Sequence, residues 1–413
     1  MQTPQKTAIA RKFLLTARFA ASGAGGGMAE DMRVLALFGS RVIFGAERGN
    51  AEALGALQST GAEVLCVVRN EAWNDELPAF LSGHNLHSVG VPHIDSFGMR
   101  DNYRIILRNP IAFVRGNWKL FEIIRSFRPT HIHAFNQLFT ISFFLTLALS
   151  RVPMVFRAGD EPTLHSIFWR AVWRFVCWRT TAFVANSRFV AKSLRKNGVS
   201  RDDITLIYSA PPSRTEDRAE DPLPHVGDNE RVVAFVGQIA EHKGPHVLVE
   251  AFRRVADRHP DVRLALAGRI SDWEGDTWAR NLRDDVAADH AIGQRVHFLG
   301  LVDNVPALLK RSTVVVVPSL FDDPSPNVVM EAKAAGRPVI GFPRGGIPEL
   351  VNDGTDGKVC EPNADALARA LEFYLSDPAT ADAHGRAAKQ TMVELGIPEF
   401  AARWHDVYAR CQA

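Results

Sequence analysis

Two kinds of apolar pattern alternate along most of the chain. Short continuous runs such as RVLALF at 33–38 predict strands that are buried on both faces, which is typical of parallel sheets. Between these runs, apolar residues recur at three- and four-residue intervals, as at 245–258, and predict helices. Because strands alternate with helices of this length, the pattern predicts a doubly wound α/β protein with right-handed crossovers.

The pattern places elements along the whole chain. In the first half we expect strands at 33–38, 63–68, 130–134, 153–156, 183–186 and 204–208, and helices at 51–58, 118–127, 140–149 and 188–197. In the second half we expect strands at 231–237, 262–267, 295–299, 313–318 and 338–342, and helices at 245–258, 277–288, 305–310, from 347, at 365–375 and at 398–411.

A polar, acidic and apolar-poor stretch divides the chain in two. It predicts a linker at 213–230 between domains at 31–212 and 231–396, which suits a chain of 413 residues. We expect a C-terminal helix at 397–413 to pack back on the first domain. Residues 1–30 are expected to be a mobile extension, because the apolar run there is short, interrupted by Arg18 and followed by SGAGGG.

Composition narrows the class of protein. A hydrophobic content of 46% with 23% charged residues is typical of a soluble globular protein. The four scattered cysteines favour a reducing compartment, and no apolar run is long enough to span a bilayer, so we expect a cytoplasmic protein. Lys and Arg exceed Asp and Glu in the first half only, which predicts an anionic partner such as a phosphorylated acceptor or the inner face of a membrane; complementarity between two facing domains is the equal alternative.

Residues 163–185 combine aromatic residues at helical spacing with three arginines. One interpretation is a basic amphipathic helix that lies on anionic lipid. We favour an ordinary domain helix with a core stripe and a solvated Arg edge, because such stripes are usually core.

The chemistry concentrates in residues 313–350. The segment predicts a buried strand, an acidic Pro-rich loop, a helix start, a second strand and a Gly-Gly turn, with Asp323 and Glu331 eight positions apart. A strand followed by a polar loop and a helix N-terminus is how α/β proteins bind phosphorylated ligands. With two doubly wound domains, this site should face a cleft.

Five motifs in this order carry a family resemblance: GQIAEHKG (237–244), VRLALAGR (262–269), VHFLG (296–300), DPSPNVVMEAKAAGRPVIG (323–341) and GGIPELVNDGTDG (345–357). Together they resemble the retaining glycosyltransferases of family 4, and the first half resembles them more loosely. The resemblance implies the GT-B fold, in which a Rossmann-like acceptor-binding domain and a Rossmann-like nucleotide-sugar-binding domain face a central cleft.

The resemblance also implies roles for residues of the donor side. Glu331 would bind the ribose hydroxyls, and Asp323 stands where the family has a longer Glu near the transferred sugar, with Asp322 able to share that role. Lys243 would neutralise the diphosphate, but Gln238 replaces the family's arginine. That change predicts weaker donor binding, a compensating cation such as Arg344 or Arg269, or a different donor. The remaining expected donor contacts are Gly237, Gly268, Arg269, Leu299, Pro326, Asn327 and Val328, with Asn327 as the cap of the following helix.

In the first domain, Gly39 resembles the family's Gly-rich loop. The run FRAGDEP keeps Asp160, which we assign to the acceptor side with Arg157 and Glu161, but has Gly159 where the family often has His; a structural turn is the equal alternative. His133 matches a strand-end histidine of the family, although a satisfied core histidine is commoner. His131 and His133 lack a third ligand nearby, so we expect no metal site.

The resemblance implies a metal-independent hexosyltransferase that moves a sugar from a nucleoside diphosphate sugar, with retention, to a glycan, lipid-linked or small-molecule acceptor in polysaccharide or glycoconjugate synthesis. The donor is a co-substrate, and we expect no cofactor and no nucleic-acid partner. The absence of a D-x-D pair in the sequence supports metal independence. The alternatives are a sugar-nucleotide epimerase or phosphorylase-like enzyme on the same fold, or a non-catalytic sugar-nucleotide or membrane-surface binding protein.

Overall fold

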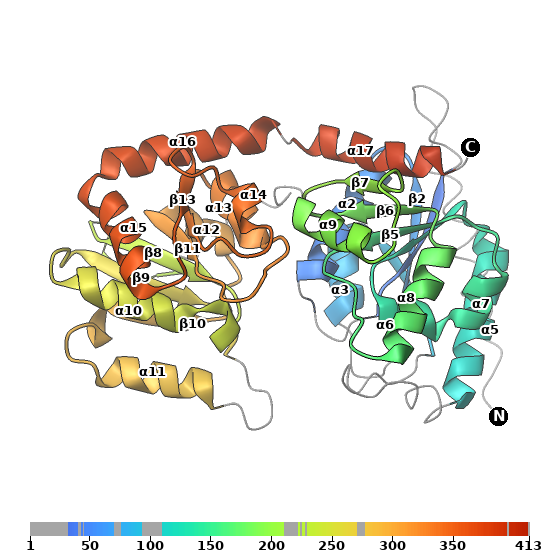
Figure 1. The fold of residues 1–413 in the computed structure, drawn as a ribbon, viewed down its shortest axis with the longest axis horizontal. Helices are drawn as coiled ribbons and strands as arrows, with labels where there is room; N and C mark the ends of the chain where they lie inside the picture. The colour runs from blue at the N-terminus through green and yellow to red at the C-terminus, as the bar shows by residue number, and fades with distance from the viewer. Residues whose placement is uncertain are drawn as a thin grey trace.

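The structure of the chain is a computed structural model. It describes residues 32–39, 43, 45–69, 76–92, 110–209, 222–223, 225–227, 229–270, 277–394 and 396–411. The expected extension at 1–30 and the first part of the expected linker lie outside these residues. Within them, the chain forms two doubly wound α/β domains side by side (Figure 1), which confirms the predicted fold class.

The first domain has a parallel sheet with the order β3-β2-β1-β4-β5-β6-β7 over its described strands. Strands β1, β4, β5 and β6 are almost fully buried because helices cover both faces of the sheet. The elements are β1 Arg33–Leu37, α2 Gly45–Gln58, β2 Glu63–Arg69, α3 Glu76–Gly83, β3 His87–Val91, α5 Pro110–Phe127, β4 His131–Ala134, α6 Gln137–Ser142, α7 Phe144–Leu149, β5 Met154–Ala158, α8 Ile167–Arg179, β6 Ala182–Ala185, α9 Arg188–Lys196 and β7 Ile204–Leu206.

The second domain has a parallel sheet with the order β10-β9-β8-β11-β12-β13 over the same part of the chain. Its first strand lies in the middle and the order reverses beside it, so the carboxyl ends of β8 and β11 open a crevice. The elements are β8 Arg231–Val236, η2 Glu241–Lys243, α10 Pro245–Ala256, β9 Val262–Ala267, α11 Trp278–Ala288, η3 Gly293–Arg295, β10 Val296–Gly300, α12 Val305–Arg311, β11 Val314–Val317, α13 Asn327–Ala334, β12 Val339–Gly341, α14 Ile347–Leu350, β13 Gly357–Val359, α15 Ala364–Ser376 and α16 Pro378–Glu394.

The chain then returns to the first domain. Helix α17, Ile397–Arg410, packs against α2, and its Trp404 and Tyr408 are buried. Figure 1 shows α16 over the second domain and α17 over the first, in red. The expected C-terminal helix therefore lies on the first domain.

The described part of the expected linker has a structural role. Leu223 and Val226 are buried beside β8 and β9, and Arg311 donates a hydrogen bond to the Glu230 carbonyl. Leu223 and Val226 attach the segment to the second domain. The polar composition of 213–230 gave no indication of this packing.

Much of the aromatic stripe of 163–185 is core, as favoured, but Trp178 near the end of α8 is 68% exposed. Trp169, Trp173 and Val176 of α8 are buried in the first domain, while its arginines at 170 and 174 are exposed. In the part of the chain that the structure describes, none of the helices is long and apolar enough to cross a membrane.

Candidate active site

The expected donor residues gather at one edge of the second sheet. Gly237 and Gln238 follow β8, Gly268 and Arg269 follow β9, and Leu299 lies near the end of β10. The acidic loop with Asp323 follows β11. Parallel strands bring these ends together, so residues far apart in sequence line one edge. Gln238 and Arg269 are exposed there.

An ion pair connects two of these residues. The Nζ atom of Lys243 donates to Oδ2 of Asp323 at 2.7 Å, and the Asp323 side chain is only 8% exposed. Lys243 also lies over the Phe321 ring, 4.7 Å from its centroid. The 3-10 turn η2 therefore presents a cation directly to the carboxylate expected near the transferred sugar.

The Gly-Gly turn supports the acidic loop from behind. The Gly346 amide donates to the Asp323 carbonyl at 2.8 Å, and the Gly345 amide donates to Asp322 Oδ1 at 3.2 Å. A Cβ atom at Gly346 would lie 2.0 Å from the Pro324 carbonyl oxygen, and one at Gly345 would lie 2.2 Å from that of Asp323. Only glycine allows this approach. Asp322 thus fixes the turn while its exposed side chain faces the cleft.

Helix α13 follows the loop, and its start differs from the prediction. Pro326 occupies the cap position and makes no side-chain cap bond, so the expected capping role of Asn327 is wrong. Asn327 is instead the first helical residue of α13. Its Nδ2 atom donates to the Gly45 carbonyl of α2 at 3.3 Å, across the interface between the domains.

Two carboxylates from different domains interact across that interface. Glu331 of α13 has a raised pKa because of burial, an effect that Arg48 opposes. Burial, followed by repulsion from Glu331, raises the pKa of Glu52 on α2 to about 7. Arg157 also acts on Glu52, and burial lowers the pKa of Arg157 to about 10. Glu331 therefore belongs to a charged cluster that includes both domains.

A cavity of about 510 Å³ opens between the domains. Asp160 and Glu161 line it from the first domain, and Asp322 lines it from the second. Burial raises the pKa of Asp160, and so does the carboxylate of Asp323, so these two groups lie within electrostatic reach of each other. The rest of the lining includes the acidic Glu47 and the aromatic and amide residues Asn50, Phe135, Asn136, Gln137, Phe156, Trp169, Trp173 and Phe321.

Other expected residues of the first domain lie in packed positions. Gly39 follows β1 against the Phe139 ring, which a Cβ atom would approach to 2.3 Å. His133 is fully buried, with Nδ1 2.6 Å from the Tyr408 hydroxyl and Nε2 2.7 Å from Asn50 Oδ1. Burial lowers its pKa to about 3, so it is neutral, accepts a hydrogen bond from the Tyr408 hydroxyl and donates one to Asn50. This is the satisfied core histidine that we considered the commoner case.

One interdomain residue was missed by sequence reasoning. Glu349 of α14 accepts hydrogen bonds from the Arg188 and Phe189 amides at 2.6 and 2.7 Å and from the Tyr208 hydroxyl at 3.1 Å. The sequence feature that could have indicated Glu349 is its position three residues after the Gly-Gly turn. Its partners, at the N-terminus of α9, could not be foreseen from the sequence.

Among the described residues, His, Cys, Asp and Glu side chains form no cluster of three or more that could hold a metal ion. The Nε atom of Arg344, next to the Gly-Gly turn, is buried and has no hydrogen-bond partner in the same part of the chain.

Comparison with known proteins adds independent information. Residues 217–391 match the family Glycosyl transferases group 1, and residues 43–210 match Glycosyltransferase Family 4. The chain is 29% identical to glycogen synthase of Mycobacterium tuberculosis over 370 residues, which cover 82% of this chain and 84% of that protein. It is 36% identical to spore coat protein SA of Bacillus subtilis over 135 residues, about a third of each chain (31% and 34%).

Solved structures show the same architecture. Anabaena Alr3699/HepE, crystallised with UDP-glucose, superimposes with a TM-score of 0.76 at 18% identity, covering 92% of this chain and all of that one (100%). The two family matches divide between the two domains and together take in most of the sequence. The chain therefore belongs to the group 1, family 4 glycosyltransferases and is a glycosyltransferase with the GT-B fold.

Proposed function

We propose that this enzyme transfers a sugar from a nucleoside diphosphate sugar, with retention of configuration, to a hydroxyl group of an acceptor in the interdomain cavity. The observation that carries the proposal is the ion pair between Lys243 and Asp323 beside that cavity. A cation next to a carboxylate suits a reaction in which a diphosphate leaves while positive charge develops at the anomeric carbon.

In the proposed reaction, Lys243 moves from Asp323 to the diphosphate when the donor binds. Amide groups at the start of α13 share the negative charge, because the helix dipole favours an anion there. The bond from the anomeric carbon to the phosphate oxygen breaks as the acceptor oxygen bonds to the same face. The acceptor's proton passes to the leaving phosphate oxygen. Asp323 stabilises the charged sugar, and Asp160 orients the acceptor hydroxyl. The reaction as proposed uses no metal and no cofactor.

For the donor, UDP-glucose is the first compound to test, since HepE was crystallised with UDP and with UDP-glucose. Glu331 would accept hydrogen bonds from the two ribose hydroxyls. Gln238 cannot supply the positive charge of the family's arginine. We propose that Arg344 compensates, because its Nε atom is buried without a partner and lies beside the loop that holds Asp323.

For the acceptor, the cavity lining favours a sugar or another polyhydroxylated group. Carboxylates such as Asp160 and Glu161 accept hydrogen bonds from hydroxyl groups, and rings such as Trp173 offer apolar faces to a sugar ring. We propose a glycan, lipid-linked or small-molecule acceptor in polysaccharide or glycoconjugate synthesis. We also propose that the enzyme is cytoplasmic and contacts an anionic membrane peripherally.

A thermal-shift panel of UDP, GDP, ADP and their sugars tests donor binding, because a ligand that binds only the folded protein raises its melting temperature. Lys243→Ala should lower kcat/KM by about 100-fold, as for loss of a group that stabilises leaving charge. Lys358→Ala is a matched control, since Lys358 also lies over a ring, Phe373, but on β13. Equal loss in both variants would refute the site, and an inverted product in NMR would refute retention.

A further inference from the structure

The first domain exposes apolar side chains that its core does not need. On α5, Leu120, Ile123 and Phe127 face the core, yet Ile111, Val114, Trp118 and Phe121 are 41–64% exposed. The exposed four follow at intervals of three and four residues, so they form one outward face of the helix. A surface helix of a soluble protein normally presents polar residues outward.

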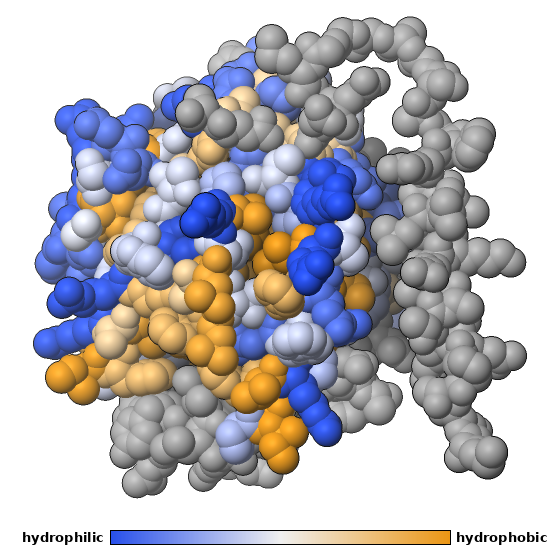
Figure 2. Space-filling view, turned by 90° about the vertical axis from the view of Figure 1, so that its right-hand side faces the viewer, coloured by the Kyte–Doolittle hydropathy of each residue, from blue (hydrophilic) through white to orange (hydrophobic). Residues whose placement is uncertain are grey.

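Helix α7 extends this surface. Leu145 is 44% exposed and Leu149 is 82% exposed. The two helices are joined by Asn117, which donates to the Ser142 carbonyl at 3.0 Å and accepts from the Thr146 amide at 3.0 Å. We call the surface formed by Ile111, Val114, Trp118, Phe121, Leu145 and Leu149 the α5–α7 face. The face of the molecule in Figure 2 carries a broad apolar region bordered by polar residues.

The charge around this surface is strongly one-sided. Helices α5, α7 and α8 carry six basic residues, Arg115, Lys119, Arg125, Arg170, Arg174 and Arg179, and one acid, Glu122. Glu122 is already engaged by Lys119 and by the Trp118 indole, at 3.1 and 3.0 Å. An apolar patch with basic residues around it matches an anionic lipid surface, where apolar tips insert and cations meet headgroups.

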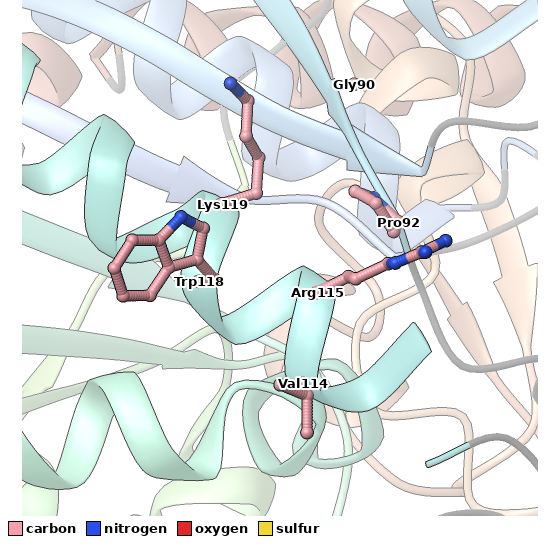
Figure 3. A pocket seen from close by; sticks show the side chains of 6 residues that line it. All are labelled: Gly90, Pro92, Val114, Arg115, Trp118 and Lys119. Carbon is pink, nitrogen blue, oxygen red and sulfur yellow. The ribbon is translucent and has the colours of Figure 1, made fainter. Parts of the chain in front are cut away.

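A hollow of about 460 Å³ opens at the edge of the α5–α7 face. It is lined by Val114, Arg115, Trp118 and Lys119 of α5 and by Gly90 and Pro92 at the end of β3 (Figure 3). Two cations beside an indole suit a phosphate headgroup at the boundary between water and lipid. A second copy of the chain fits this surface poorly, since a two-fold contact would oppose two equally basic faces.

We propose that the α5–α7 face docks on an anionic bilayer, with Trp118 and Leu149 inserted and Arg115 and Lys119 on the lipid phosphates. This proposal rests on the peripheral membrane contact proposed above and assigns it to a specific surface. It differs from the alternative considered from the sequence, because Trp169 and Trp173 of α8 are buried and the docking residues come from α5 and α7.

The test is co-sedimentation of the full chain with phosphatidylcholine vesicles, with and without phosphatidylglycerol. We expect salt-sensitive binding to the anionic vesicles only. Each of Arg115→Gln and Lys119→Gln should weaken partitioning roughly fivefold, and Trp118→Ala with Leu149→Ser should weaken it by about tenfold or more. Leu301→Ala and Arg283→Gln, exposed changes in the second domain, are the matched controls.

All these side chains are exposed, so circular dichroism melting curves should stay unchanged. UDP-glucose thermal shift, measured without vesicles, should also stay unchanged, which separates failure of this proposal from failure of the proposed transfer. Absence of binding, equal binding to neutral vesicles, or equal loss in the control variants would overturn it. Self-association that disappears in the Trp118 variant would also overturn it, by assigning the face to a second copy.

Discussion

Glu349 offers the sharpest test of how the domains are coupled. Its carboxylate accepts three hydrogen bonds from the first domain, two of them from the first amides of α9, Arg188 and Phe189. These amides have no partner within their own helix, and the helix dipole favours an anion beside them. Glu349→Ala removes all three bonds, whereas Glu349→Gln keeps an acceptor but loses the charge.

The expected size follows from these contacts. A hydrogen bond to a charged group contributes about 1.5–3 kcal/mol, and Glu349 is half-buried, so we expect the alanine variant to destabilise the interdomain contact by about 2–4 kcal/mol. A change of about 3 kcal/mol shifts the ratio of closed to open forms by roughly 100-fold. Tyr208→Phe removes only the 3.1 Å bond and should cost about 1 kcal/mol.

Loss of these hydrogen bonds should also lower catalytic activity, because α14 begins at the Gly-Gly turn that holds Asp323. Glu349→Ala should increase the radius of gyration in small-angle X-ray scattering and lower kcat/KM for transfer, with Glu349→Gln in between. Glu361→Ala, an exposed acid of the same domain, is the control. Unchanged scattering and kinetics in Glu349→Ala would refute the coupling. The effects of Glu349→Ala and Tyr208→Phe should not add in the double mutant, because both remove the same hydrogen bond, so additive effects would also refute it.

Three further predictions concern the folded protein. The pKa of Glu52 is raised to about 7, so its contribution to stability falls as pH rises from its ordinary pKa near 4.5 through 7. Glu52→Gln should therefore have a higher melting temperature than the wild type at pH 8 and the same melting temperature near pH 4. A difference that stays constant with pH would contradict this. Tyr408→Phe leaves the buried Nδ1 of His133 unpaired and should cost about 1–3 kcal/mol in urea unfolding while the UDP-glucose thermal shift persists; unchanged unfolding would contradict it. Gly346→Ala should displace the acidic loop and abolish that thermal shift, whereas Gly55→Ala, whose Cβ has 3.7 Å to its nearest neighbour, should be neutral or stabilising by about 0.5–1 kcal/mol; equal effects would contradict the close approach.

Most strands could be predicted closely because they are apolar runs, as in the VVVV of β11, whereas β3 (HSVGV) and β13 (GKV) are not. Helix starts were harder, since tertiary contacts decide them. Helix α2 begins at Gly45, six residues before the predicted start, because Gly49 lowers helix propensity in the sequence. In the structure, that glycine makes room for the guanidinium of Arg157, which a Cβ would approach to 2.8 Å.

The single helix expected at 140–149 is two helices, α6 and α7, which meet at Phe143. The cause is Asn117 of α5, twenty-five residues from Ser142 in sequence. Its amide binds the Ser142 carbonyl and the Thr146 amide, a donor and acceptor that would otherwise bond each other in a continuous helix. A polar insertion from a distant element leaves no trace in the periodicity. Helix α3, strands β3 and β13, and helix α16 were also missed.

The difference between local sequence patterns and contacts of distant elements also explains which half of the site could be predicted from the sequence. The second domain builds its site from loops within single β-α units, so the motif around Asp323 carries both its residues and their spacing. The interdomain cavity instead joins Asp160, after β5, to Asp322, after β11, and no local pattern connects them. The hydrogen bonds of Glu349 also join distant segments, since the Arg188 and Phe189 amides that it binds belong to α9. These pairings form only when the two domains meet, so no local sequence pattern predicts them.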